Sequence, residues 1–260
     1  MIQSEHIVSV LTPFVITWAL LAVRLAVVLG ATPVFEQFPV PGLVRACFVF
    51  AFSAALAATL PAAREMADPS AGHLLRWAIE EALAGGLLAL CVNIGFGAFS
   101  MGARLIDIQI GFGISQVFDP FTRRDTPILS ALFANFAVLA FFLSGGYIVM
   151  LRAFAYLVSI MPPGADALPH IDAQAVLEGG ARLFVVGLAL VAPVVLCLLT
   201  VEAALVLAAR GLPRMNVFVV GMPLKIVTGL VSLSFWLAHA RDPIDHALGA
   251  SFDIFRRALD

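Results

Sequence analysis

Long runs of residues without a charge constrain this chain more than any other feature. Four such runs cover residues 46–63, 82–103, 126–151 and 183–201, and a membrane helix needs about 20 mostly apolar residues. Two more apolar segments, 7–35 and 215–240, are each interrupted by one charged residue, Arg24 and Lys225 respectively. The sequence therefore predicts an all-α integral membrane protein with about six hydrophobic helical segments.

Composition leaves no room for a soluble domain. Only 12% of the residues are charged and 62% are hydrophobic, whereas about 25% are charged in soluble domains. We therefore expect residues 1–260 to form one membrane-embedded domain. The net charge of -2 and the lack of a Lys/Arg block argue against nucleic acid as a partner. Glu5 and His6 precede the first apolar segment, which predicts a retained helix and not a secretory signal.

Prolines, glycines and charges mark breaks that would fold these segments into helical hairpins. The breaks fall at residues 36–42, 61–69, 119–127, 162–178, 210–214 and 241–243. The connection 210–214 is so short that its flanking helices must run antiparallel and touch.

Most loop arginines lie in the odd-numbered connections, which favours an outside N-terminus. Six spans would then place the arginines of the tail outside too, so either the charge rule fails here or one segment does not span.

A glycine-rich stretch follows the third segment. Gly111 and Gly113 stand beside the polar residues Gln109, Ser115 and Gln116. Glycine-broken polar backbone at membrane depth is tolerated only where protein buries it or where it lines an aqueous path. The stretch therefore predicts a pore or gate. Gly95, Gly97 and Gly102 lie just before it, and for them close packing of helices is an equal alternative.

The last apolar segment contains Gly221, Pro223 and Lys225, the only lysine of the chain. Proline removes a backbone donor and clashes with the preceding turn, which predicts a kink near residues 221–223. Glu202 and Lys225 both lie roughly 12–14 Å from the turn of the same hairpin, so we predict an ion pair between them. The alternative is that each side chain reaches the interface or pairs with another subunit. Arg24 poses the same question together with Glu80 and Glu81.

Catalytic signals are absent from the sequence. The five histidines form no His-Glu-x-x-His metal site, and Gly113-Ile114-Ser115 lacks the glycine spacing of a hydrolase elbow. We predict neither an enzyme nor a cofactor nor a metal site.

Three stretches together resemble the family of type III export-gate proteins formed by flagellar FliR and injectisome SctT. They are Ile106-Asp107-Ile108-Gln109-Ile110-Gly111-Phe112-Gly113 with the following Asp119-Pro120, the stretch 141–147, and Pro213-Arg214-Met215-Asn216-Val217-Phe218-Val219-Val220-Gly221-Met222-Pro223-Leu224-Lys225. The resemblance extends over essentially the whole chain. The Val-Gly-x-Pro-Leu-Lys ending is more similar to the flagellar branch, although Arg214 and Met222 depart from the usual motif.

The resemblance implies a subunit that assembles with FliP and FliQ, with FlhB attached, into a conduit for unfolded flagellar proteins. The conduit would lie in the bacterial inner membrane, in contact with lipid, at the flagellar basal body. It also implies that a loop plugs the pore, and this loop maps onto Gln109, Ile110, Gly111, Phe112, Gly113, Ile114, Ser115 and Gln116. Segments of such proteins pack against FliP or FliQ, so hydropathy would overcount the true spans.

Two other functions stay open at this point. An SctT-type injectisome subunit shares the chemistry and differs in its partners. A small-solute secondary transporter also uses broken helices and charges at mid-membrane depth, although no inverted repeat is visible in the sequence.

Overall fold

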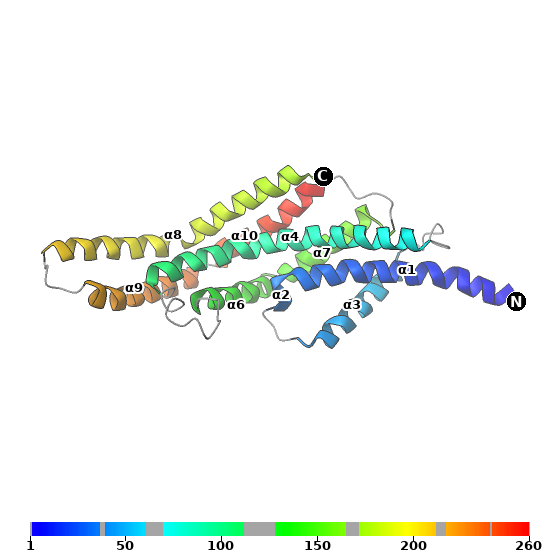
Figure 1. Ribbon diagram of the computed structural model, residues 1–260, viewed down its shortest axis with the longest axis horizontal. Coiled ribbons are helices and arrows are strands. Elements are labelled where there is room, and N and C mark those ends of the chain that lie inside the picture. Colours follow the sequence, from blue (N-terminus) through cyan, green and yellow to red (C-terminus); the bar gives the residue numbers. More distant parts are fainter. Residues whose placement is uncertain are drawn as a thin grey trace. The chain divides into compact units, whose positions relative to one another are not determined.

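The computed structural model describes residues 2–36, 40–60, 70–111, 128–164, 172–211, 217–239 and 241–259, and every element in them is a helix (Figure 1). These are α1 (Ile2–Ala31), α2 (Pro33–Glu36), α3 (Gly42–Ala57), α4 (Ala71–Ile110), α6 (Ile128–Leu143), α7 (Gly146–Ile160), α8 (Ala173–Gly211), α9 (Val217–His239) and α10 (Arg241–Leu259). The predicted all-α class is confirmed.

Each of the six predicted hydrophobic segments contains a helix, but they differ in length. Within the described residues, α4, α8 and the stretches Thr12–Ala31 of α1 and Val219–Ala238 of α9 are long and apolar enough to cross a membrane, and α6 with α7 is a fifth candidate. The 16 residues of α3 extend about 24 Å, short of a hydrocarbon core of about 30 Å. Four or five spans therefore fit better than six.

Two helix boundaries differ from the prediction. The break expected through residue 178 ends earlier, because Asp172 caps α8: its Oδ1 accepts hydrogen bonds from the N–H groups of Gln174 at 2.9 Å and Ala175 at 3.2 Å. A break was also expected at residues 241–243, yet α10 begins at Arg241. This helix alternates apolar and charged residues, so a search for apolar runs passes over it.

The apolar run 126–151, predicted as one segment, holds two helices. α6 ends at Leu143 and α7 begins at Gly146. Gly145 between them has φ 76°, a conformation that glycine adopts without strain. A Cβ on Gly146 would lie 2.5 Å from the ring of Phe141. The two adjacent glycines therefore allow a sharp turn inside an apolar run.

The chain divides into two compact units, each built from separate stretches. The first comprises Met1–Asn93, Tyr147–Val176 and Phe252–Asp260, and the second comprises Ile94–Gly146 and Leu177–Ser251. Whether they act as the single expected domain stays a prediction.

In the first unit, α1 and the first half of α4 run in the same direction. Leu20 packs on Trp77, and one turn further along both helices Arg24 pairs with Glu81. A Cβ on Gly85 would lie only 2.6 Å from the Arg24 carbonyl oxygen, so this glycine lets the two backbones approach closely.

The short helix α3 also belongs to the first unit and lies beside α1 (Figure 1). The indole Nε1 of Trp18 donates to the carbonyl of Phe50 at 3.0 Å, and the ring of Phe52 meets Phe154 edge to face. α3 therefore connects α1 with α7 through aromatic side chains.

In the second unit, α4 and α8 cross at small residues. A Cβ on Gly187 would lie 2.6 Å from the carbonyl oxygen of Ala98, and one on Gly102 would lie 2.7 Å from the Val191 side chain. Close packing is thus confirmed for Gly102, whereas Gly97 has nothing within 4 Å of its Cβ position.

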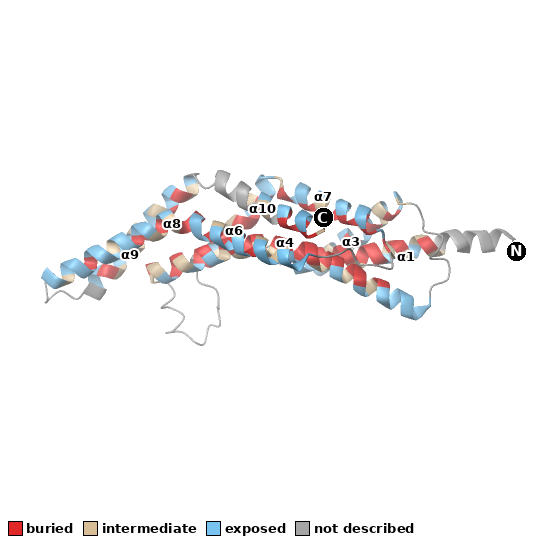
Figure 2. Ribbon diagram, turned by 90° about the horizontal axis from the view of Figure 1, so that it is seen from above, coloured by how far each residue is buried: buried red, intermediate tan, exposed pale blue. Residues whose placement is uncertain are grey.

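The hairpin of α8 and α9 completes the second unit. Trp236 Nε1 donates to the Leu190 carbonyl, and nearer the turn Leu205 contacts Gly221. The residue numbers rise on one helix as they fall on the other, so the predicted antiparallel contact is confirmed. Figure 2 shows exposed residues along most of α9, and only 17% of its apolar window is buried.

Candidate functional site at the end of α4

The predicted plug begins in a helix and not in a loop. α4 continues through Ile110, so Gln109 and Ile110 form its last turn, which corrects the expectation for these two residues. Gly111 follows with φ 98°, and its N–H donates to the Asp107 carbonyl at 3.1 Å. A glycine in this conformation ends a helix without strain. The remaining residues of the predicted plug and the separate loop motif after it lie outside the described part of the chain: Phe112, Gly113, Ile114, Ser115 and Gln116 in the plug, and Asp119 and Pro120 in the motif.

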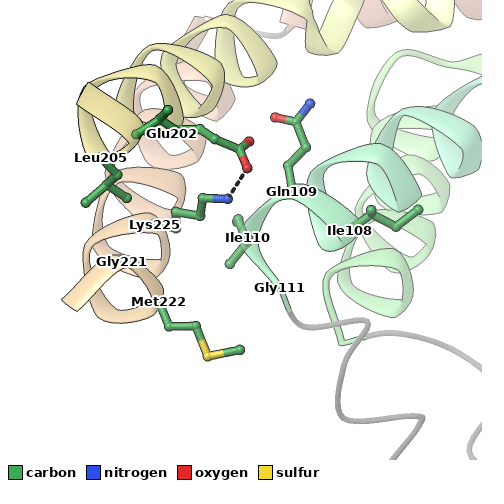
Figure 3. A pocket seen from close by; sticks show the side chains of 10 residues that line it. Ile108, Gln109, Ile110, Gly111, Glu202, Leu205, Gly221, Met222 and Lys225 are labelled. Atoms are coloured by element: carbon green, nitrogen blue, oxygen red, sulfur yellow. Dashed lines mark hydrogen bonds and ion pairs between the residues drawn. The ribbon is translucent and has the colours of Figure 1, made fainter. Parts of the chain in front are cut away.

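A cavity of about 300 Å³ lies between the last turn of α4 and the hairpin of α8 and α9 (Figure 3). It is lined by Ile108, Gln109, Ile110, Gly111, Glu202, Leu205, Val206, Gly221, Met222 and Lys225. Residues 108–111 of the first stretch that suggested an export gate therefore meet Gly221, Met222 and Lys225 of the second at this cavity.

The ion pair expected from the hairpin spacing is present at the cavity. Lys225 Nζ lies 2.9 Å from Glu202 Oε1 (Figure 3). The Lys225 side chain is 21% exposed and that of Glu202 is 50% exposed. The carboxylate therefore keeps an open side even though it is paired.

Gln109 contributes a second oxygen to the cavity. Its Oε1 is buried and has no hydrogen-bond partner among the described residues. In Figure 3 this oxygen lies on the side of the Glu202 carboxylate. Leaving a buried acceptor without a donor costs about 1–3 kcal/mol, so the site favours an additional donor here.

The proline of α9 lies at the edge of this site. α9 continues through Pro223, whose side chain is exposed, and a Cβ on Gly221 would lie 3.1 Å from Leu205. Gly221 thus allows α9 to approach α8 closely. A kink at Pro223 stays a prediction.

Asp107 ties the end of α4 to the start of α6. Its side chain is fully buried, and Oδ2 accepts from the Ser130 N–H at 2.8 Å and from the Ser130 hydroxyl at 2.6 Å. A carboxylate at the first turn of a helix satisfies an orphan N–H group and complements the helix dipole. Our sequence reasoning missed this role, for which the only signal was an acidic residue inside an apolar motif.

Replacing Asp107 with Ala is expected to lower the free energy of unfolding by about 1–3 kcal/mol, because two buried donors of Ser130 lose their acceptor. Asp107→Asn keeps an oxygen acceptor and should lose less, and Ser130→Ala removes one donor together with its bond. Denaturant titration of the purified protein measures the ranking. Equal stability of the Asp107→Ala variant and the unmodified chain would contradict the capping role.

Glu202 and Lys225 should be energetically coupled. Glu202→Gln and Lys225→Met are each expected to destabilise the protein, and the double variant should lose less than the sum by roughly 1 kcal/mol, since both groups keep some access to solvent. The same titration on the four chains gives the coupling. Strictly additive losses would mean that the two charges have separate partners.

A second charged cluster lies in the first unit and answers the question left open for Arg24. Its Nε pairs with Glu81 Oε2, and its Nη2 donates to the Met161 carbonyl at 3.0 Å. The side chains of Arg24 and Glu81 are 0% and 1% exposed. Arg24 therefore joins α1, α4 and the end of α7. Within the described residues, no three His, Cys, Asp or Glu side chains gather as metal ligands.

Apolar helices long enough to cross a bilayer, with the charged side chains Arg24 and Glu81, and Glu202 and Lys225, paired with one another, define a multi-pass membrane protein. Residues 15–250 match the family model described as bacterial export proteins, family 1. The chain belongs to this family.

Individual relatives point the same way. The chain is 26% identical over 214 residues to the flagellar biosynthetic protein FliR of Escherichia coli, covering 82% of this chain and 80% of that protein. It is 28% identical over 220 residues to FliR of Bacillus subtilis, covering 82% and 83%. The secretion system apparatus protein SsaT of Salmonella typhimurium is 27% identical over 164 residues, covering 61% and 63%.

Proposed function

We propose that this chain is the FliR-type subunit of a flagellar type III protein export gate. The observation that carries the proposal is the meeting of residues 108–111 with α9 at one cavity, in a chain that belongs to a family of bacterial export proteins. These two stretches are about a hundred residues apart in sequence, and both were singled out by their likeness to export-gate motifs.

The flagellar assignment is supported over the injectisome alternative by how much of the chain each kind of relative matches. The FliR proteins of Escherichia coli and Pectobacterium carotovorum cover 82% and 91% of this chain. SsaT covers 61% and the SpaR protein of Shigella flexneri covers 59%. An injectisome subunit stays the second candidate, because these shorter matches are of similar identity.

In this proposal the chain assembles with FliP and FliQ, with FlhB attached, in the inner membrane at the flagellar basal body. Together they pass unfolded proteins outward. Residues 109–116 occlude the conduit at rest. The first of these residues stand in the last turn of α4, close to the place where Asp107 holds the start of α6, so the proposed plug starts from a fixed point.

Deleting residues 111–115 from the assembled gate is expected to increase ion leak across the membrane, because glycine-broken polar backbone between apolar helices needs a conduit or protein around it. Conductance of vesicles that carry the assembled gate measures the leak. Deletion of residues 86–90, inside α4, serves as a control that should prevent assembly altogether. Unchanged conductance with assembly intact would remove the plug assignment.

Removal of the gene from its host, followed by complementation, tests the function itself. Loss of motility and of export of flagellar proteins is expected, with both restored by the intact chain. Purification of the tagged chain, with mass spectrometry of what accompanies it, should recover FliP, FliQ and FlhB. Recovery of injectisome subunits would support the second candidate, and stoichiometric solute flux by the purified chain alone would support a secondary transporter.

A further inference from the structure

We propose that the cavity between the end of α4 and the hairpin of α8 and α9 receives a basic side chain, an ammonium or a guanidinium group, from a neighbouring subunit. The inference rests on the proposed function only in requiring that neighbouring subunits exist. Its chemistry comes from the groups that line the cavity.

The groups that line the cavity include several oxygen acceptors and one positive charge, that of Lys225. Gln109 Oε1 is buried without a donor among the described residues, and Glu202 uses Oε1 for Lys225 while its side chain is half exposed. The C-terminal end of α4 borders the cavity, and the C-terminal end of a helix attracts cations. Lys225 occupies only one oxygen of Glu202, so the second oxygen and Gln109 Oε1 favour one more donor, and the helix end favours a positively charged one.

The walls of the cavity suit the stem of a long basic side chain. They are formed by Ile108, Ile110, Leu205, Val206 and Met222. Lysine and arginine bury their methylene groups along apolar surface while the charged head reaches a polar group. A guanidinium has five donors in a fixed fork, which is enough to serve the carboxylate and the amide oxygen together.

A permanent neighbour fits this site better than lipid or a passing substrate. Glu202 stands half exposed on α8, and the facing helix α9 is buried over only 17% of its apolar window. A carboxylate in contact with hydrocarbon is costly, and that cost persists between export events. The described residues leave this side of Glu202 open, and we assign its cover at rest to a resident subunit that supplies the donor.

Cysteine labelling tests two parts of the proposal separately: the preference of the cavity for a positive charge, and the cover of the cavity by a partner subunit. Met222→Cys is introduced after Cys47, Cys91 and Cys197 are replaced by Ala, with Leu177→Cys as control, which is 74% exposed on α8, outside the charge-free run 183–201 and not among the cavity residues. In membranes without the partner subunits, a trimethylammonium thiosulfonate should label position 222 about tenfold faster, relative to position 177, than a sulfonate analogue does. Glu202→Gln should reverse this preference, because Lys225 would then be the one charged side chain among the described residues that line the cavity.

Assembly with the partner subunits should protect position 222 from both reagents. Equal rates for the two reagents without partners, no labelling at all, or full labelling in the assembled gate would each overturn the proposal. If the chain is degraded without partners, a crosslinking experiment on the assembled gate tests the proposal instead. A benzoyl-phenylalanine at Ile108, which lines the cavity and is 70% exposed, should crosslink in the assembled gate to a subunit peptide carrying Lys or Arg.

Crosslinking to lipid alone, to the exported protein alone, or to a peptide without a basic residue would contradict the inference. A wrong assignment of the export function gives another result: no flagellar subunits would then accompany the purified chain. Recovery of those subunits without protection of position 222 would reject the cavity proposal and leave the export function intact.

Discussion

Replacing Arg24 with Met is expected to destabilise the protein by about 3–5 kcal/mol, because the Glu81 carboxylate would remain buried without its partner. Both side chains are almost completely buried in the first unit, and the Met161 carbonyl would lose the donor that Nη2 provides. Denaturant titration of the purified protein measures the loss. Recovery of the assembled complex from membranes should fall in parallel.

Two further variants separate charge from packing at this site. Arg24→Met with Glu81→Met removes both charges and should recover much of the loss, since an apolar replacement of a buried pair is often neutral or stabilising. Arg182→Met breaks an exposed pair with Glu178, where the side chains are 67% and 54% exposed, and should cost less than about 1 kcal/mol. Equal losses of stability for Arg24→Met and Arg182→Met would show that burial of the pair of Arg24 and Glu81 adds nothing to the free energy of unfolding.

Replacing Gly187 with Ala is expected to weaken the crossing of α4 and α8 by roughly 1–3 kcal/mol, and Gly187→Leu by more. The new Cβ would lie 2.6 Å from the Ala98 carbonyl oxygen, which is backbone and cannot rotate away, so the helices must separate. The midpoint of thermal unfolding of the purified protein should fall for Ala and fall further for Leu.

Gly97→Ala, in α4, is the matched control, because nothing lies within 4 Å of the Cβ position of Gly97. Alanine is the better helix former by about 1 kcal/mol, so this variant should be as stable as the unmodified chain or slightly more stable. A similar loss at both positions would mean that the backbone contact between α4 and α8 is absent in the protein.

The sequence was sufficient for the helices that are apolar throughout, since a charge-free run long enough for a bilayer has few other folds available. The prediction failed where a few residues set the local structure against the mean hydropathy of the stretch around them. Ser144, Gly145 and Gly146 turn the chain inside an apolar run, and Asp172 starts α8 inside a stretch expected to be a break. The helix α10 was not predicted, because its apolar residues are interleaved with charged ones and form no long apolar run.

The same distinction applies to the charged pairs. Glu202 and Lys225 could be matched from the sequence because they belong to one hairpin, where distance from the turn sets depth. Arg24 and Glu81 are 57 positions apart on helices that run in the same direction, and no turn between them fixes a register. The binding of Ser130 by Asp107 depends likewise on how α4 and α6 meet.

The exposed apolar surface of α8 has a consequence for the surroundings of the chain. Leu177 and Leu207 are both exposed, at 74% and 65%, and the 30 residues from one to the other in α8 extend about 45 Å. A helix tilted by 40°, the upper end of the usual range, would still project this length to about 34 Å, more than a hydrocarbon core of about 30 Å. One end of this surface therefore lies beyond the reach of acyl chains, and the exposed pair of Glu178 and Arg182 marks the end near Leu177 as the one that meets headgroups or water.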